Sequence, residues 1–146
     1  MPSLVVNQGL QRIGVQASSG TNAAEPTFGT GRTIQVMTWD IGGTAFAAAN
    51  TKLNDSGDVL GTVNTQYFDQ AFDLTPSRSS QTVTHISTLG TADGNFVIRR
   101  IALHDNTAAN VTNSSTSLVC GVDGQSLTKT SDFTLETTLN LLYTSV

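Results

Sequence analysis

The sequence predicts an all-β protein, an antiparallel β-sandwich or jelly-roll-like barrel with one short N-terminal helix. Thr, Ser, Asn and Gly supply 60 of the 146 residues, a composition typical of pleated surfaces and turns. Segments rich in β-branched residues, about six to eight of them, are separated by clusters of turn residues. A hydrophobic content of 38% at a net charge of −4 is sufficient for a packed core. The chain length then predicts a single domain over residues 1–146.

The N-terminal region carries the best helical pattern. Val6, Leu10, Ile13 and Ala17 recur at spacings of four, three and four, and Asn7 can cap the start. We therefore expect a helix over residues 7–17 and a mobile polar loop over 18–31. Residues 1–31 would form this helix and arm, and residues 32–146 the β-sandwich core.

The first predicted strand is RTIQVMTWDI, residues 32–41. Ile34 and Val36 lie on one face, and Met37, Trp39 and Ile41 lie on the other. Because both faces are apolar, we expect this strand to be buried on two sides.

The middle of the chain predicts a hairpin. Residues 81–89 and 95–103 have strand composition, and residues 90–94 between them supply the turn. Residues 63–74 predict an interrupted strand, and residues 116–122 predict a strand that ends at a turn of Asp123 and Gly124. For residues 42–53 a short helix and an extended loop both remain open.

The clearest strand pattern lies in residues 133–143. Apolar and hydroxyl side chains alternate regularly along it, which indicates one buried and one wetter face. The predicted buried face carries Phe133, Leu135, Thr137, Leu139, Leu141 and Tyr143. Because the alternation is so regular, we expect an interior or interface strand whose backbone is paired on both sides.

Charge and cysteine content exclude several classes of protein. Only 12% of residues are charged and the net charge is −4, which argues against a nucleic-acid partner. The single cysteine, Cys120, rules out an intrachain disulfide and a cysteine-rich zinc site. The first residues lack a basic segment followed by a long apolar one, so we expect no signal peptide. No apolar run approaches the length of a membrane span.

The two histidines are the strongest candidates for catalysis. His85 and His104 could approach each other across the predicted hairpin and, with Asp105, form a metal site or a base with its orienting partner. No third ligand is placed by spacing, so a structural role is favoured.

Other catalytic constellations are also weak. No Gly-x-Ser-x-Gly elbow occurs, and Ser126 follows a predicted turn. Glu25 and Glu136 are the only glutamates, and most aspartates lie beside turn residues, which is a poor basis for a glycosidase pair. We predict no catalytic, cofactor-binding or metal-ligating residue, no cofactor and no enzyme activity.

Arg99 and Arg100 fall in a predicted strand, so their side chains point to opposite faces. One of them must face the less wetted side and needs a carboxylate, either within the fold or on a partner subunit. Both possibilities remain open. Cys120, between Val119 and Gly121, is expected to be a small buried hydrophobic residue.

Glycines and aromatic residues suggest two further kinds of site. Residues 29–31 and 42–43 are glycine-rich but too short for a phosphate-binding loop. An aromatic platform for carbohydrate could use Trp39, Phe28, Phe46, Phe68 and Phe72. Aromatic residues make up only 6% of the chain, however, so we expect the core to use most of them.

Two segments resemble small virion proteins of tailed phages, of the tail-collar-fibre and decoration kind. LVVNQGLQRIGVQAS resembles the short N-terminal helix of such proteins. NFVIRRIALHDNTAANVTNSSTSLVCGVDGQSLTKTSDFTL resembles their β-rich C-terminal part. The resemblance covers about half the chain. It lies in the residue composition and in the order of the sequence patterns and includes no diagnostic motif. It implies a non-enzymatic, all-β subunit that acts in multiple copies.

From this resemblance we expect a capsid decoration (cement) subunit located in the virion. Its size suits a single module, and the chain has no fibrous repeat. Its partners would be further copies of itself, as a symmetric trimer, and the major capsid protein, with no nucleic acid or membrane involved. The N-terminal residues and residues 18–31 would contact the shell. The alternatives are a tail, neck-fibre or collar component that contacts the host surface, and a small carbohydrate-binding module or hydrolase.

Overall fold

The computed structural model describes residues 4–5, 34–53, 62–74, 76–79, 82–105 and 118–142. This part of the chain forms ten β-strands and contains no helix. The strands are β1 (Leu4–Val5), β2 (Val36–Asp40), β3 (Tyr67–Ala71), β4 (Ser77–Ser79), β5 (Thr82–Leu89), β6 (Val97–Ile98), β7 (Arg100–His104), β8 (Leu118–Val122), β9 (Leu127–Thr128) and β10 (Leu135–Leu142). The predicted all-β class is therefore confirmed for the described residues, whereas the predicted helix (7–17) and loop (18–31) lie outside them.

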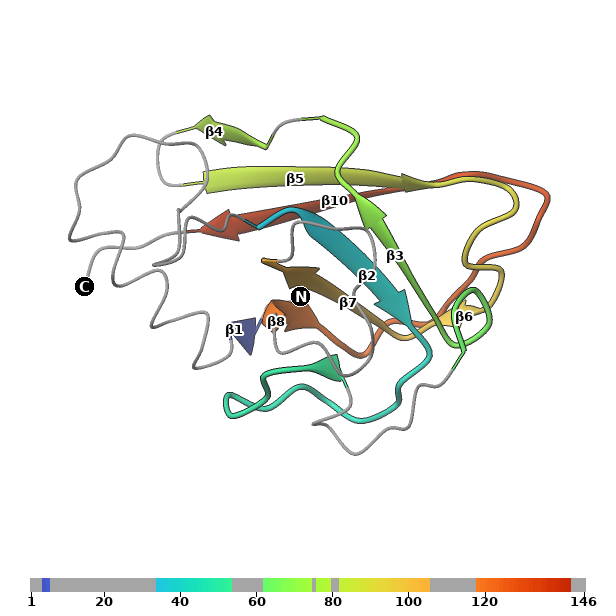
Figure 1. The fold of residues 1–146 in the computed structure, drawn as a ribbon, viewed down its shortest axis with the longest axis horizontal. Helices are drawn as coiled ribbons and strands as arrows, with labels where there is room; N and C mark the ends of the chain where they lie inside the picture. Colours follow the sequence, from blue (N-terminus) through green and yellow to red (C-terminus); the bar gives the residue numbers. More distant parts are fainter. Residues whose placement is uncertain are drawn as a thin grey trace.

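The strands form two main antiparallel sheets and a small ribbon (Figure 1). The larger sheet has five strands in the order β1-β8-β7-β2-β3, and the smaller has three in the order β10-β5-β4. Strands β6 and β9 pair with each other. The strands β5 and β10 of the smaller sheet run at an oblique angle to β2 and β3 of the larger one (Figure 1).

The main core lies between the two sheets. It joins Trp39 and Leu103 of the larger sheet to Leu89 and Leu141 of the smaller one. A hydrogen bond also joins the layers, since Trp39 Nε1 donates to Thr137 Oγ1 at 3.0 Å. Strand β5 shows the alternation that such packing requires, with every second residue buried.

A second layer of packing covers the opposite face of the larger sheet. Phe46 and Leu53, from the segment that follows β2, pack there against Ala102 and Leu118. Because β2 is central in its sheet and covered on both faces, all five of its residues are buried. Two-sided burial of the first predicted strand is thus confirmed, and residues 42–53 form a covering loop rather than a helix.

The predicted hairpin of residues 81–89 and 95–103 is wrong. Strand β5 pairs with β4 and β10, whereas β7 pairs with β2 and β8. The turn after β5 therefore carries the chain from one sheet to the other. Gly94, at φ 60°, supplies a left-handed conformation there, and its N–H donates to Asn64 Oδ1 at 2.6 Å. A turn with these residues can join the two strands of a hairpin or carry the chain from one sheet to another. The turn residues alone therefore do not distinguish the two.

The alternation predicted for residues 133–143 is confirmed. Of the two predicted positions, an interior one is not seen among the described residues, whereas pairing with a partner at an interface stays a prediction. Strand β10 pairs with β5 along its whole length, from Leu135 opposite Leu89 to Leu142 opposite Thr82. On its other side it has no neighbouring strand among the described residues, so within this part of the chain it is an edge strand. The predicted strand at 63–74 is shorter than expected, because residues 64–66 form a turn before β3 begins.

Candidate functional site

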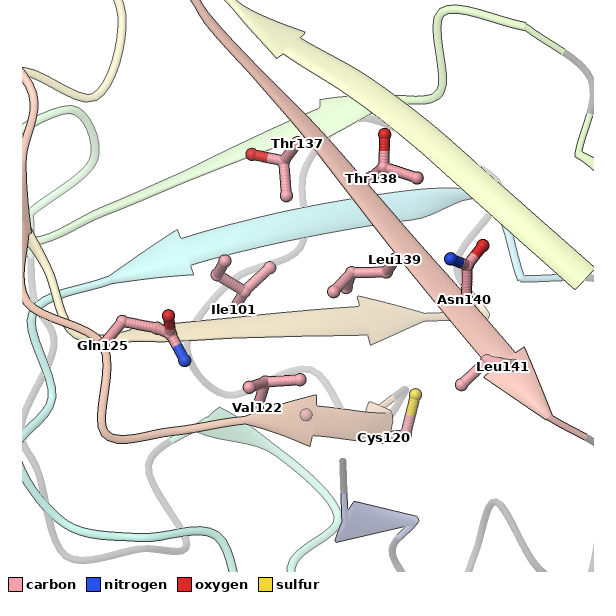
Figure 2. Close-up of a pocket in the computed structure, with 10 residues that line it drawn as sticks. Ile101, Cys120, Val122, Gln125, Thr137, Thr138, Leu139, Asn140 and Leu141 are labelled. Carbon is pink, nitrogen blue, oxygen red and sulfur yellow. The ribbon is translucent and has the colours of Figure 1, made fainter. Parts of the chain in front are cut away.

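A groove lies between β10 and the inner face of β7 and β8 (Figure 2). Its volume is about 440 Å³, within the range of small binding sites. Residues of β10 and of the β7–β8 pair line it from opposite sides. The lining residues are Ile101, Cys120, Gly121, Val122, Gln125, Thr137, Thr138, Leu139, Asn140 and Leu141.

The groove exists because the two sheets have different widths. Among the described strands the smaller sheet ends at β10, whereas the larger sheet continues beyond β7 through β8 and β1. Thr137 of β10 is bonded to Trp39 of β2, and Leu141 packs with Cys120 of β8. Strand β10 therefore crosses the larger sheet obliquely, and a wedge opens between it and the end of β8 (Figure 2).

The faces of β10 follow directly from its alternation. Leu139 is half-buried and Leu141 is buried, and both point toward β7 and β8 in Figure 2. Thr138 and Asn140 are exposed, and their side chains point away from the groove (Figure 2). The groove is therefore walled on this side by apolar side chains and by the backbone of β10.

The direction of the β10 backbone groups can be worked out from its neighbour. The N–H of Asp73 donates to the carbonyl of Ile86 at 3.0 Å, so Ile86 directs its backbone groups away from β10. Ile86 is paired with Thr138. In an antiparallel pair, two opposite residues either exchange backbone hydrogen bonds or both direct their N–H and C=O groups away from each other. Thr138 therefore aims its N–H and C=O at the free edge. The same orientation recurs at every second residue, namely Glu136, Thr138, Asn140 and Leu142.

The lining side chains are uncharged hydrocarbon, hydroxyl, amide and thiol groups. The only charge on β10 is Glu136, which is exposed on the outer face of the strand. The single cysteine, Cys120, is buried, as predicted. Such a groove is suited to binding by shape and by backbone hydrogen bonds.

One of the two neighbouring arginines forms an ion pair inside the fold. Arg100 is fully buried, and its Nε donates to Asp40 Oδ1 at 2.7 Å. Its Nη1 donates to the carbonyl of Thr44 at 3.0 Å, and the guanidinium lies 4.6 Å from the centroid of the Phe46 ring. Arg99 is exposed. Of the two open possibilities, the structure therefore shows a carboxylate within the fold.

Gly42 makes room for this ion pair. A Cβ at this position would overlap with the guanidinium of Arg100. The N–H of Gly42 also donates to Asp40 Oδ1 at 2.7 Å. Gly42 thus belongs to the buried charge network of the scaffold, whereas Gly43 is exposed and residues 29–31 lie outside the described part.

The two histidines are separated by the larger sheet. His85 lies on the inner face of β5, where its ring is 5.0 Å from that of Phe72. His104 shares a face of β7 with Arg100 and Ala102, the face covered by residues 42–53. Burial lowers the pKa of His104 to about 3, so it is neutral near pH 7. The described residues contain no group of three potential metal ligands.

The remaining candidates are dispersed. Trp39 and Phe46 are buried, so they cannot form an exposed carbohydrate platform. Phe68 and Phe72 are half-buried against the core, and Phe28 lies outside the described residues. Ser126 is exposed between β8 and β9, and Glu25 also lies outside the described residues.

The groove is not indicated by the sequence alone. Its walls come from strands far apart in the chain, and no local pattern reports which strand ends a sheet. One usable signal was present, because β10 is eight residues long and contains neither Lys nor Pro. Those are residues with which natural proteins commonly block an exposed edge.

Comparison of the chain with protein-family models, with curated proteins and with solved structures gave no match. Within the described residues, no helix is long and apolar enough to cross a membrane.

Proposed function

We propose that the chain is a non-enzymatic structural subunit of a bacteriophage virion, and specifically a capsid decoration (cement) subunit with a β-sandwich fold. It acts as a symmetric oligomer, a trimer, on the major capsid protein. The observation that carries the proposal is the open edge of β10 above an uncharged groove. The resemblance of residues 4–18 and 95–135 to tailed-phage virion proteins supplies the biological setting.

An open edge favours an assembly role for a physical reason. Its unpaired N–H and C=O groups form a template for another chain, and natural proteins usually block such edges with Lys, Pro, bulges or a covering segment. Strand β10 has regular pairing along eight residues, with no register shift. A regular edge strand without these blocking features is expected in a protein that binds a partner at that strand.

The scaffold suits a mechanical function. The larger sheet is packed on both faces, and a buried ion pair ties the end of β2 to β7. Such a module adds buried area across subunit junctions and thereby opposes their separation under internal pressure. The lining of the groove supports contact rather than acid–base chemistry, since it presents no carboxylate, imidazole or amine.

The test is a negative-stain image of purified phage particles labelled with antibodies against this chain. We expect label distributed over the capsid surface. Label confined to the tail or collar would replace the decoration proposal with the fibre or collar alternative. Particles without label would contradict a virion role altogether.

Oligomerisation is tested separately by light scattering on the purified chain and on the chain bound to capsids. A trimer is expected in at least one of the two states. A monomer in both would contradict the proposed symmetric oligomer.

A further inference from the structure

We propose that the edge of β10 that has no neighbouring strand in the described part of the chain binds one extended segment of another polypeptide by strand addition. The added segment would become a fourth strand of the smaller sheet. Every second side chain of it would enter the groove over Ile101 and Val122. This inference concerns the binding mode of the edge and does not depend on the virion assignment.

Hydrogen bonding is the first requirement, and β10 meets it. The N–H and C=O groups of Glu136, Thr138 and Asn140 point outward at a spacing of two residues, as derived above. An extended chain presents its own donors and acceptors at the same spacing. Strand addition would therefore satisfy these groups in pairs, and this main-chain pairing is what gives affinity in known complexes of the type.

The spacing of strands and sheets places an added strand over β8. In a sheet the next strand lies about 4.8 Å away, and packed sheets lie about 10 Å apart. A strand added beside β10 would lie above β8, whose inner face carries Cys120 and Val122. It would thus cover the part of the larger sheet that the smaller sheet leaves open.

A second copy docked through its own β10 does not fit this opening. Edge-to-edge pairing of two copies would place both larger sheets in the same layer. Each larger sheet extends past its β10, so its outer strands would collide with those of the other copy. The proposed occupant is therefore a single extended segment and not the β10 edge of a second copy.

The groove also specifies the chemistry of the segment. The side chains that point inward meet Ile101, Val122, Leu139 and Leu141, so they should be apolar and small enough to share about 440 Å³. The side chains that point outward lie beside Glu136, the only charge on β10. A neutral or basic residue is favoured at that position, and an acidic one is disfavoured. Roughly five to eight residues match the usual length of a strand.

The test uses the full ¹⁵N-labelled chain and two synthetic peptides. The first peptide, LKTTLNLL, has the alternation of β10 with Lys in place of its Glu. The control, LLTKNTLL, has the same composition without that alternation. At a concentration about 100 times its Kd, the first peptide should slow amide exchange at Thr138 and Asn140 about 100-fold. Thr137 and Leu139 should change little, because their N–H groups already bond to β5.

Two variants locate the site. Thr138→Pro removes one outward N–H from an edge strand, a position where Pro is tolerated, and should abolish peptide binding while the chain stays folded. Thr138→Ala keeps the N–H and should bind the peptide as the unaltered chain does.

Three results would overturn the proposal. The first is the absence of protection at Thr138 and Asn140 in the unaltered chain. The second is equal protection by the control peptide. The third is shifted methyl signals of Ile101 and Val122 without amide protection, which would identify an apolar pocket instead of a strand site.

Discussion

Replacing Asp40 by Asn should strongly destabilise the chain, because it leaves a buried guanidinium without its counter-charge. Asp40 and Arg100 are both fully buried, and Asp40 Oδ1 accepts from Arg100 Nε and from the N–H of Gly42. Asn has nearly the same shape as Asp, so the change removes charge rather than volume.

The magnitude follows from the burial of the pair. Breaking a buried ion pair by removing one partner costs about 3–5 kcal/mol. For a chain of this length, a loss of that size corresponds to a fall in Tm of about 10–15 °C. Chemical denaturation followed by circular dichroism would measure the free energy of unfolding, and a thermal scan would measure Tm.

Arg99 provides the matched control, since it is the neighbouring arginine and it is exposed. Arg99→Ala should change the free energy of unfolding by no more than about 0.5 kcal/mol. A loss below about 1 kcal/mol for Asp40→Asn would refute the reasoning. So would a larger loss for Arg99→Ala than for Asp40→Asn.

Three further predictions concern other parts of the fold. Gly42→Ala should destabilise the chain by about 1–3 kcal/mol in a denaturant titration, because the new Cβ overlaps with the buried Arg100 guanidinium; unchanged stability would mean that the loop moves freely. Leu141→Ala should cost about 2–5 kcal/mol and Leu142→Ala less than about 0.5, because Leu141 is 5% exposed and Leu142 is 67% exposed; equal losses would contradict the assigned faces of β10. Because burial holds the pKa of His104 at about 3, the unfolded chain takes up its proton first, and stability present above about pH 6.5 is lost as the pH falls. At pH 5 this loss is about 2 kcal/mol, and His104→Gln should remove it from the measured pH dependence.

The sequence predicted properties that depend on local alternation. Apolar residues on both sides of Trp39 predicted the two-sided burial of β2, and the regular pattern from Leu135 onward predicted the faces of β10. The opposed directions of Arg99 and Arg100 predicted that one charge would be buried and paired. In each case the period of a strand determines which side a residue faces.

Strand neighbours were not predictable in the same way. Residues 81–103 have the turn and strand composition of a hairpin, yet β5 and β7 belong to different sheets. Alternation reports the face of a strand but not its partner, because pairing depends on contacts between residues far apart in the chain. The groove could not be found from sequence for this reason, since it arises where β10 ends one sheet while β8 continues the other.

Amide hydrogen exchange in the free chain tests the open edge of β10 most directly. We expect fast exchange at Glu136, Thr138 and Asn140, whose N–H groups point outward. We expect slow exchange at Thr137 and Leu139, whose N–H groups bond to β5. Uniform protection along β10, or the opposite alternation, would contradict a free edge and with it the proposed interaction site.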